Sequence, residues 1–246
     1  MKAQKSILRL ALSVFLLLCG SLSSVMAATI GDGMADRMRS CAACHGQEGR
    51  ATNQGYFPRI AGKPSGYLFN QLVNFRNGKR KNATMAYLVD QMSDAYLQEI
   101  ADYFSSLELP YPPPPRPSEA GPNLAAALAR GEQLVRQGDV ARGLPACAAC
   151  HGAAMTGMLP ATPGLVGLPR DYILSQFGAW RNGQRHAAKP DCMRDVAERL
   201  STEDVGAMAT WLALQPVPAN AKPVSQAPQA LAASLASPMK CGSMVP

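Results

Sequence analysis

A five-residue motif occurs twice in the chain and constrains the fold more than any other feature. The two copies are Cys41-Ala42-Ala43-Cys44-His45 and Cys147-Ala148-Ala149-Cys150-His151. Two thiols on one helical turn reach the two vinyl groups of one porphyrin, and the adjacent histidine then lies beneath the iron. The motif therefore predicts two covalently bound haem c groups, held by thioethers from Cys41, Cys44, Cys147 and Cys150.

Two other uses of the motif fit less well. Zinc requires four ligands, and each copy offers three with no obvious fourth nearby. A thioredoxin-like redox pair gives no reason for a histidine directly after the second cysteine, and this histidine is present in both copies. The motif and its duplication together favour haem.

The composition agrees with haem and argues against nucleic acid. Only 6% of the residues are aromatic, which is low for two cores built from side chains alone, and each macrocycle would act as a large apolar core group. The formal net charge of +7 includes Lys2, Lys5 and Arg9, without which 21 basic residues face 17 acidic ones. Four haem propionates would offset most of this excess. No basic run is interleaved with aromatic residues, so we expect no nucleic-acid partner.

The N-terminal segment has the organisation of a signal peptide. Basic residues precede an apolar stretch from Leu10 to Cys19, which is too short to span a bilayer. Small residues end the segment at Ala27, so we predict a signal peptide over residues 1–27 that is cleaved after Ala27. An uncleaved anchor is the alternative. Export to the periplasm agrees with haem attachment, which takes place outside the cytoplasm.

A proline-rich segment divides the rest of the chain. Seven prolines lie between residues 110 and 122, which indicates a stiff, extended linker. We predict one domain over residues 28–109, the linker over 110–122, a second domain over 123–215 and an Ala/Pro-rich tail over 216–246.

Apolar periodicity indicates helices in both domains. We expect a short helix over 31–39 that runs into the first motif, and a longer one over 65–77 that Ser65 caps. A last helix, capped by Ser93, has apolar residues from Leu97 to Leu107 on one face. Residues 124–137 predict the matching first helix of the second domain. Residues 46–62 and 79–83 are predicted to be loops.

An internal repeat relates the two domains. Five positions recur 105 residues later: Pro58, Gly62, Pro64, Tyr67 and Gln71 match Pro163, Gly167, Pro169, Tyr172 and Gln176. Phe75-Arg76-Asn77-Gly78 also recurs as Trp180-Arg181-Asn182-Gly183, and Arg80 recurs as Arg185. A tandem duplication of one haem domain explains this run of identities.

The repeat also selects the sixth iron ligands. Met85 lies eight residues before Ser93, and Met193 lies eight residues before Ser201. A methionine thioether is a soft ligand that suits haem iron and raises its reduction potential. We therefore predict two axial pairs, His45/Met85 and His151/Met193. Because Leu200 matches Met92, that methionine is expected in the core.

Other residues near the two haems have predicted roles. We expect the carbonyls of Pro58 and Pro163 to accept the second N–H of the two histidines. Arg76 and Arg181, with Tyr67 and Tyr172, are expected either to pair with haem propionates or to stabilise the contact between the domains; the arginines on solvated surface are the alternative. His186 is expected to be a solvated loop residue, with iron ligation as its alternative.

Two cysteines remain outside the motifs in the mature chain. An oxidising periplasm favours a disulfide between Cys192 and Cys241, which would pin the tail beside Met193. Two alternatives stay open: Cys192 ligates iron as a thiolate, or both thiols are free.

The motifs together resemble the diheme cytochromes c of the cytochrome c4 family, which are tandem class I cytochrome c domains. The resemblance covers about Gly31 to Gln215 and rests on the two haem motifs, the Pro-x-Ile/Leu-x-Gly segments, the Arg-Asn-Gly turns and the segments between each methionine and the last helix. It implies an all-α fold, His/Met haems and electron transfer from quinol-oxidising complexes to a terminal oxidase. The proline-rich linker and the tail depart from the family pattern.

Two classes of function follow. The first is a carrier of single electrons, diffusible or peripherally associated with a membrane, whose partners are a membrane respiratory complex and an oxidase. The second is a haem-bearing electron-acceptor subunit of a periplasmic dehydrogenase. A diheme enzyme requires an open iron site, and two methionine ligands close both irons. We therefore expect an electron-transfer protein that is not an enzyme.

Overall fold

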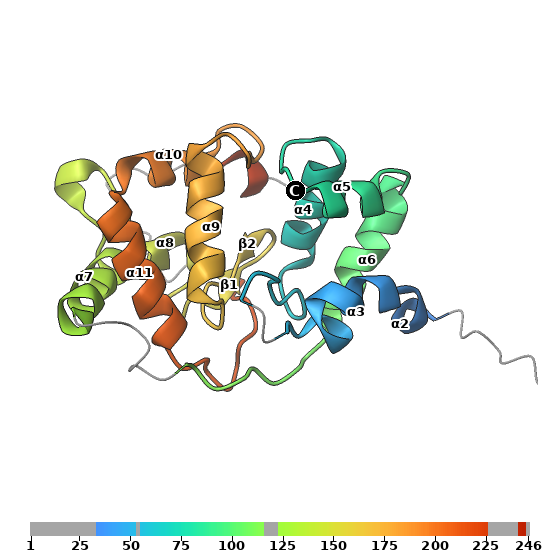
Figure 1. The fold of residues 1–246 in the computed structure, drawn as a ribbon, viewed down its shortest axis with the longest axis horizontal. Helices are drawn as coiled ribbons and strands as arrows, with labels where there is room; N and C mark the ends of the chain where they lie inside the picture. The colour runs from blue at the N-terminus through green and yellow to red at the C-terminus, as the bar shows by residue number, and fades with distance from the viewer. Residues whose placement is uncertain (1–32, 53–54, 116–122, 226–240, 245–246) are drawn as a thin grey trace, which may run out of the picture. The chain divides into compact units, whose positions relative to one another are not determined.

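The computed structural model describes residues 33–52, 55–115, 123–225 and 241–244 (Figure 1). The predicted signal peptide and its cleavage site lie outside these residues. The chain divides after Asp36, within the short helix α2 (Met34–Arg37), and the architecture below is that of Arg37–Pro246. Its described part is helical apart from one two-stranded antiparallel sheet, which agrees with the predicted all-α class.

The first half of this unit, residues 37–115, contains four α-helices and one 3-10 helix. They are α3 (Arg39–His45), η1 (Gln47–Gly49), α4 (Ser65–Arg76), α5 (Ala83–Val89) and α6 (Asp94–Ser106). Helix α4 packs against both α5 and α6 (Figure 1). Ser93 caps α6 as predicted, because its hydroxyl accepts from the Tyr96 N–H at 3.2 Å. The buried face of α6 carries Leu97, Ile100, Ala101 and Phe104.

The second half, residues 123–225, repeats this arrangement. It contains α7 (Leu124–Arg136), η3 (Val140–Arg142), α8 (Cys147–His151), β1 (Gly157–Met158), β2 (Thr162–Pro163), α9 (Arg170–Arg181), α10 (Cys192–Arg199) and α11 (Thr202–Leu214). Helix α11 packs against α7 and α9 (Figure 1). The close crossing of α7 and α11 requires Gly131, because a Cβ there would lie 2.4 Å from the Ala207 carbonyl oxygen.

The equivalent helices begin and end alike. Pro64 and Pro169 precede α4 and α9, and each long helix is followed by a glycine with positive φ, Gly78 at 70° and Gly183 at 65°. Left-handed backbone favours glycine, so the recurring Asn-Gly pair ends both helices in the same way.

Several expected boundaries were wrong. Pro64, not Ser65, is the N-cap of α4, and the segment expected as one helix over 31–39 is divided between α2 and α3. Both methionines lie on short helices, α5 and α10, that were not predicted, and strands β1 and β2 were also missed. These elements have two to eight residues, which is too short for apolar periodicity to reveal.

The described residues after α11 also contact the second half. Val224 pairs in parallel with Met158, with the Val224 N–H donating to Gly157 O at 3.0 Å. Near the end of the chain, the predicted disulfide between Cys192 and Cys241 is present, and η4 (Gly242–Met244) follows it. The Gly242 N–H donates to Pro190 O at 3.0 Å. Among the described residues, no helix has the length and apolar character needed to cross a membrane.

Candidate haem-binding sites

Both motif histidines are oriented by a proline carbonyl. His45 Nδ1 lies 2.9 Å from Pro58 O, and His151 Nδ1 lies 2.8 Å from Pro163 O. A carbonyl only accepts, so Nδ1 carries the proton in each ring and Nε2 remains as the metal-binding atom. The predicted role of the two prolines is confirmed.

Burial keeps both histidines neutral. It lowers the pKa of His45 and of His151, and the hydrogen bond to the proline carbonyl opposes this shift without reversing it. His151 is only 6% exposed. The neutral imidazole is the form that binds a metal, so each ring is prepared for axial ligation.

The motif thiols share one turn of helix in each half. Cys41 and Cys44 lie on α3, Cys147 and Cys150 lie on α8, and none of the four is in a disulfide. Burial raises the pKa of Cys41 and Cys150, and raises that of Cys147 to about 12. In the described part of the chain, no three or more His, Cys, Asp or Glu side chains gather into a group that could hold a metal ion.

The two predicted methionine ligands lie near the start of equivalent helices. Met85 is half-buried on α5, and its N–H donates at 3.0 Å to Oδ1 of Asn82, which caps the helix. Met193 is partly buried on α10 and packs against the hydrophobic core of the second half. The assignment of both sulfurs to iron remains a prediction.

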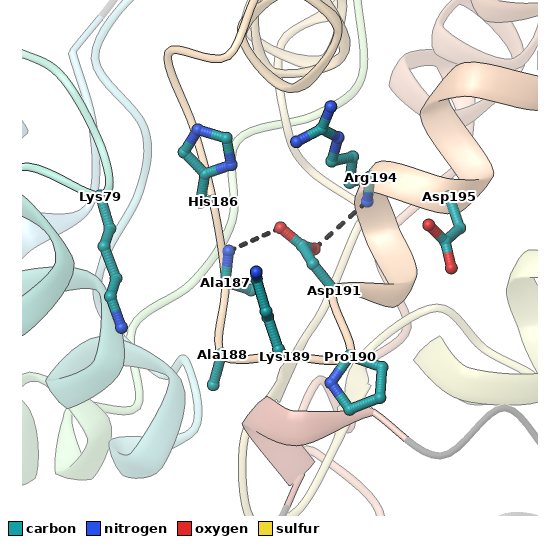
Figure 2. A pocket seen from close by; sticks show the side chains of 9 residues that line it. All are labelled: Lys79, His186, Ala187, Ala188, Lys189, Pro190, Asp191, Arg194 and Asp195. Atoms are coloured by element: carbon teal, nitrogen blue, oxygen red, sulfur yellow. Dashed lines mark hydrogen bonds between the residues drawn. The ribbon is translucent and has the colours of Figure 1, made fainter.

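Several contacts fix the start of α10. Asp191 accepts from the N–H groups of Ala187 at 2.7 Å and Arg194 at 3.2 Å, as the dashed lines in Figure 2 show. These residues line a pocket together with Lys79, His186, Ala188, Lys189, Pro190 and Asp195 (Figure 2). His186 is half-buried in this pocket, and its Nε2 lies 3.1 Å from Gly183 O. The Cys192–Cys241 disulfide adds a covalent link one residue before Met193.

Arg76 and Arg181 each bind the segment that follows the methionine helix of their own half, and neither hydrogen bond crosses to the other half. Arg76 donates to Met92 O at 2.6 Å, and Arg181 donates to the equivalent carbonyl of Leu200. Each arginine thus ties the long helix of its own half to the segment that follows the methionine helix. The expectation that these arginines stabilise the contact between the domains was wrong.

Arg80 and Arg185 form that contact instead. They face each other in an antiparallel bridge, flanked by hydrogen bonds from Lys81 N–H to Gln184 O and from His186 N–H to Lys79 O, both 2.7 Å. The sequence repeat had paired the two arginines without giving them a role.

The side chains of this contact cross between the halves. Arg80 donates to the Tyr172 hydroxyl at 3.0 Å and to Gln176 Oε1 at 2.8 Å. Arg185 reciprocates by donating to the Tyr67 hydroxyl at 3.4 Å and to Gln71 Oε1 at 3.2 Å. The expectation that both tyrosines take part in the domain contact is confirmed.

The charge of this cluster fits haem carboxylates. The hydrogen-bond acceptors around Arg80 and Arg185 in the described residues are amide and phenol oxygens, not carboxylates. The pKa of Tyr67 is raised by burial but lowered further by the two arginines, with a net fall. The Trp180 Nε1–H is also buried without an acceptor, next to the Arg185 guanidinium that lies 4.0 Å from its ring centre. A haem brings two propionates, which are the anionic acceptors that these donors lack.

Comparison with known proteins agrees with this geometry. The family model described as cytochrome c matches residues 32–108. The thiosulfate dehydrogenase electron acceptor of Thiomonas intermedia (strain K12) is 39% identical over 178 residues, which are 72% of this chain and 79% of the relative. Cytochrome c4 of Pseudomonas aeruginosa is 34% identical, over 76% of this chain and 90% of the relative. The crystal structure of reduced recombinant cytochrome c4 from Pseudomonas stutzeri has a TM-score of 0.61 and 31% identity, and covers 72% of this chain and 93% of that one.

Proposed function

Because this chain belongs to the cytochrome c4 family and carries two covalent haem c groups, we propose that it is a periplasmic carrier of single electrons with two His/Met haems. Cys41 and Cys44 hold the first haem and Cys147 and Cys150 the second. The axial pairs are His45/Met85 and His151/Met193. Held by these residues, each haem would supply one-electron redox chemistry, and the protein itself would catalyse no further reaction.

The observation that carries this proposal is the pair of histidine–proline hydrogen bonds. They leave the same nitrogen of each imidazole available to iron, directly after two thiols on one helical turn. The chain's own residues orient the imidazoles and exclude water from His151. Arg80 and Arg185, of which Arg185 is buried, supply positive charge between the halves for the propionates.

Spectroscopy of methionine variants tests the axial pairs. We expect Met85→Ala and Met193→Ala each to remove one of two methionine–iron charge-transfer bands and to lower the potential of one haem. Met92→Ala is the matched control and should change neither. Loss of a band in Met92→Ala, with both bands retained in Met85→Ala, would show that the assignment in the first half is wrong.

We further propose that the electron donor is a dehydrogenase of the thiosulfate-oxidising class. The 39% identity to a thiosulfate dehydrogenase electron acceptor supports this donor. The cytochrome c4 relatives support the second candidate, a quinol-oxidising complex that delivers electrons for a terminal oxidase. With either donor, we propose that the protein acts in the periplasm after its signal peptide is cleaved after Ala27.

Reduction kinetics separate the two donors. The oxidised protein is mixed with a thiosulfate dehydrogenase and thiosulfate, and separately with a quinol-oxidising complex and quinol. We expect faster reduction of both haems in the first mixture at equal donor concentrations. Reduction by the quinol-oxidising complex alone would reject the dehydrogenase and leave the respiratory role.

The domain bounds are also part of this proposal. We propose haem domains at 28–109 and 123–215, joined by the linker at 110–122 and followed by the tail from 216. Limited proteolysis of the holoprotein should cut first within the proposed linker, 110–122, and yield two fragments with one haem each. A first cut inside either haem domain would contradict these bounds.

A further inference from the structure

Lys63 is a buried cation that crosses from the first half to the second. It is 4% exposed and lies in the turn between Gly62 and Pro64. Its Nζ donates to Gly164 O at 3.0 Å, 101 residues along the chain. None of the ion pairs among the described side chains includes Lys63, and burial together with the nearby Arg59 charge lowers its pKa to about 7. Burial of a lysine ammonium without an anionic partner lowers the stability of the folded protein, so such burial is rare unless the charge has a role.

The acceptor of this lysine belongs to the loop that holds His151. Gly164 directly follows Pro163, whose carbonyl accepts from His151 Nδ1. Two consecutive carbonyls therefore bind an imidazole N–H and a lysine ammonium. The backbone here leaves little space for movement, since a Cβ at Gly164 would lie 2.5 Å from the Thr156 carbonyl oxygen.

The site where Lys63 enters is also close-packed. A Cβ at Gly66, at the start of α4, would lie 2.8 Å from Pro160 O in the second half. The start of α4 thus rests directly on the backbone between β1 and β2. Lys63 lies three residues before this close contact.

The two halves supply this cation differently. At the repeat position of Lys63 the second half has buried Leu168, and at the position of Gly164 the first half has Arg59. Arg59 donates to Pro110 O at 3.0 Å and lies 3.9 Å from the ring centre of Tyr111. The first histidine loop therefore has a cation from its own half, whereas the second receives its cation from the other half.

We propose that Lys63 is a positioning residue that raises the reduction potential of the second haem. A fixed cation beside the loop favours the ferrous form, which carries one positive charge fewer than the ferric form. Its hydrogen bond also polarises the peptide chain next to the His151 acceptor, which makes the imidazole a weaker electron donor to iron. The proposal rests on His151 as the axial ligand of the second haem.

The test measures both potentials in the full holoprotein by spectroelectrochemistry at pH 6, where Lys63 is protonated. Lys63→Met removes the charge and the donor, and Lys63→Gln removes the charge but keeps a donor. We expect each to lower the equilibrium constant for reducing the second haem about tenfold, or about 59 mV for one electron. Lys63→Arg, and Lys81→Met as an exposed lysine control, should leave both potentials in place. Met85→Ala identifies the first haem, because its potential falls separately.

The results that overturn the proposal are distinct. If the reduction potentials are unchanged in Lys63→Met and Lys63→Gln, or if the potentials of both haems fall equally, Lys63 does not tune the second haem. If Lys63→Arg lowers the potential of the second haem as much as Lys63→Gln does, the charge is not the cause. Failure of the axial assignment at the second haem is seen separately, as the retention of both methionine–iron bands in Met193→Ala with Lys63 unchanged.

Discussion

The two helices that carry the methionines, α5 and α10, differ more from each other than do the two loops whose proline carbonyls accept from the histidines. Helix α5 (Ala-Thr-Met-Ala-Tyr-Leu-Val) has no charged residue, and its Tyr87 is 83% exposed. Helix α10 (Cys-Met-Arg-Asp-Val-Ala-Glu-Arg) has four charged residues and is tied to the tail by a disulfide. The duplication has kept the geometry of the imidazoles and changed the surface and anchoring of the methionines. The surface and the anchoring around Met85 therefore differ from those around Met193.

We expect removal of the disulfide to change the relative stability of the two halves most. Cys241→Ser should destabilise the second half by up to about 4 kcal/mol, because the loop closed by residues 49 apart no longer limits the unfolded state. Denaturant unfolding, followed by the methionine–iron band of each haem, measures the change. The band assigned to Met85 should disappear at the same denaturant concentration as in the native protein.

The released Cys192 provides a second readout in the same variant. If its thiolate ligates iron, Cys241→Ser will show a new thiolate–iron spectrum; we expect none, since Met193 holds that position. Cys192→Ser combined with Cys241→Ser is the control that has no free thiol. An equal loss of stability in both halves would mean that the disulfide does not distinguish the two methionine helices.

A smaller effect is expected at the last helix, where the halves also differ. Ser201 and Asp204 form a capping box at the start of α11, and Asp204 also accepts from Arg130 at 2.8 Å and Arg142 at 2.6 Å. The first half has Tyr96 at the position of Asp204. Asp204→Asn should lower the free energy of unfolding of the second half by about 2 kcal/mol, because Arg130 and Arg142 lose charge-assisted hydrogen bonds to Asp204 and keep those to Asp139.

The same residue gives a pH dependence with a defined sign. Burial raises the pKa of Asp204, but hydrogen bonds from Arg130 and Arg142 outweigh it and lower the pKa from 3.8 to about 2. The stabilisation is therefore complete above pH 3.8 and is lost as the pH falls towards 2. Thermal unfolding between pH 5 and 2 should show this loss in the native protein and in the exposed control Asp171→Asn, but not in Asp204→Asn.

The smallest expected effect comes from removing the side-chain caps at the start of α5 and α10. Asn82→Ala removes the cap of α5 and should reduce the stability of that helix by about 1 kcal/mol. The band assigned to Met85 should then disappear at a lower temperature. Asp191→Ala is the matched variant, and it should lower the corresponding temperature for Met193 less, because the disulfide still holds the start of α10. An equal fall at both helices would remove the proposed difference in anchoring.

Much of this architecture could be predicted because the chain contains its own alignment. Long amphipathic helices showed their period, and the repeat placed Pro58 and Pro163 at equivalent positions, where both carbonyls accept from a histidine. Parity and compartment were sufficient for the disulfide.

The features that could not be predicted depend on individual hydrogen bonds, which no periodicity or repeat in the sequence shows. Helices α5 and α10 are short and begin with side-chain caps at Asn82 and Asp191, so local hydrogen bonds rather than periodicity define them. The carbonyl partners of Arg76 and Arg181 were not predicted, because sequence spacing does not show where a long side chain ends. Lys63 has no cationic counterpart in the repeat, so only the folded contact with Gly164 reveals it.

The reciprocal bonds of Arg80 and Arg185 have the form of an isologous interface inside one polypeptide. Each arginine uses the same two acceptor types in the other half, as residues do across the two-fold axis of a homodimer. Such a contact does not depend on covalent connection for its geometry. The covalent connection between the two halves therefore acts mainly through effective concentration, because it keeps one half within reach of the other at any dilution.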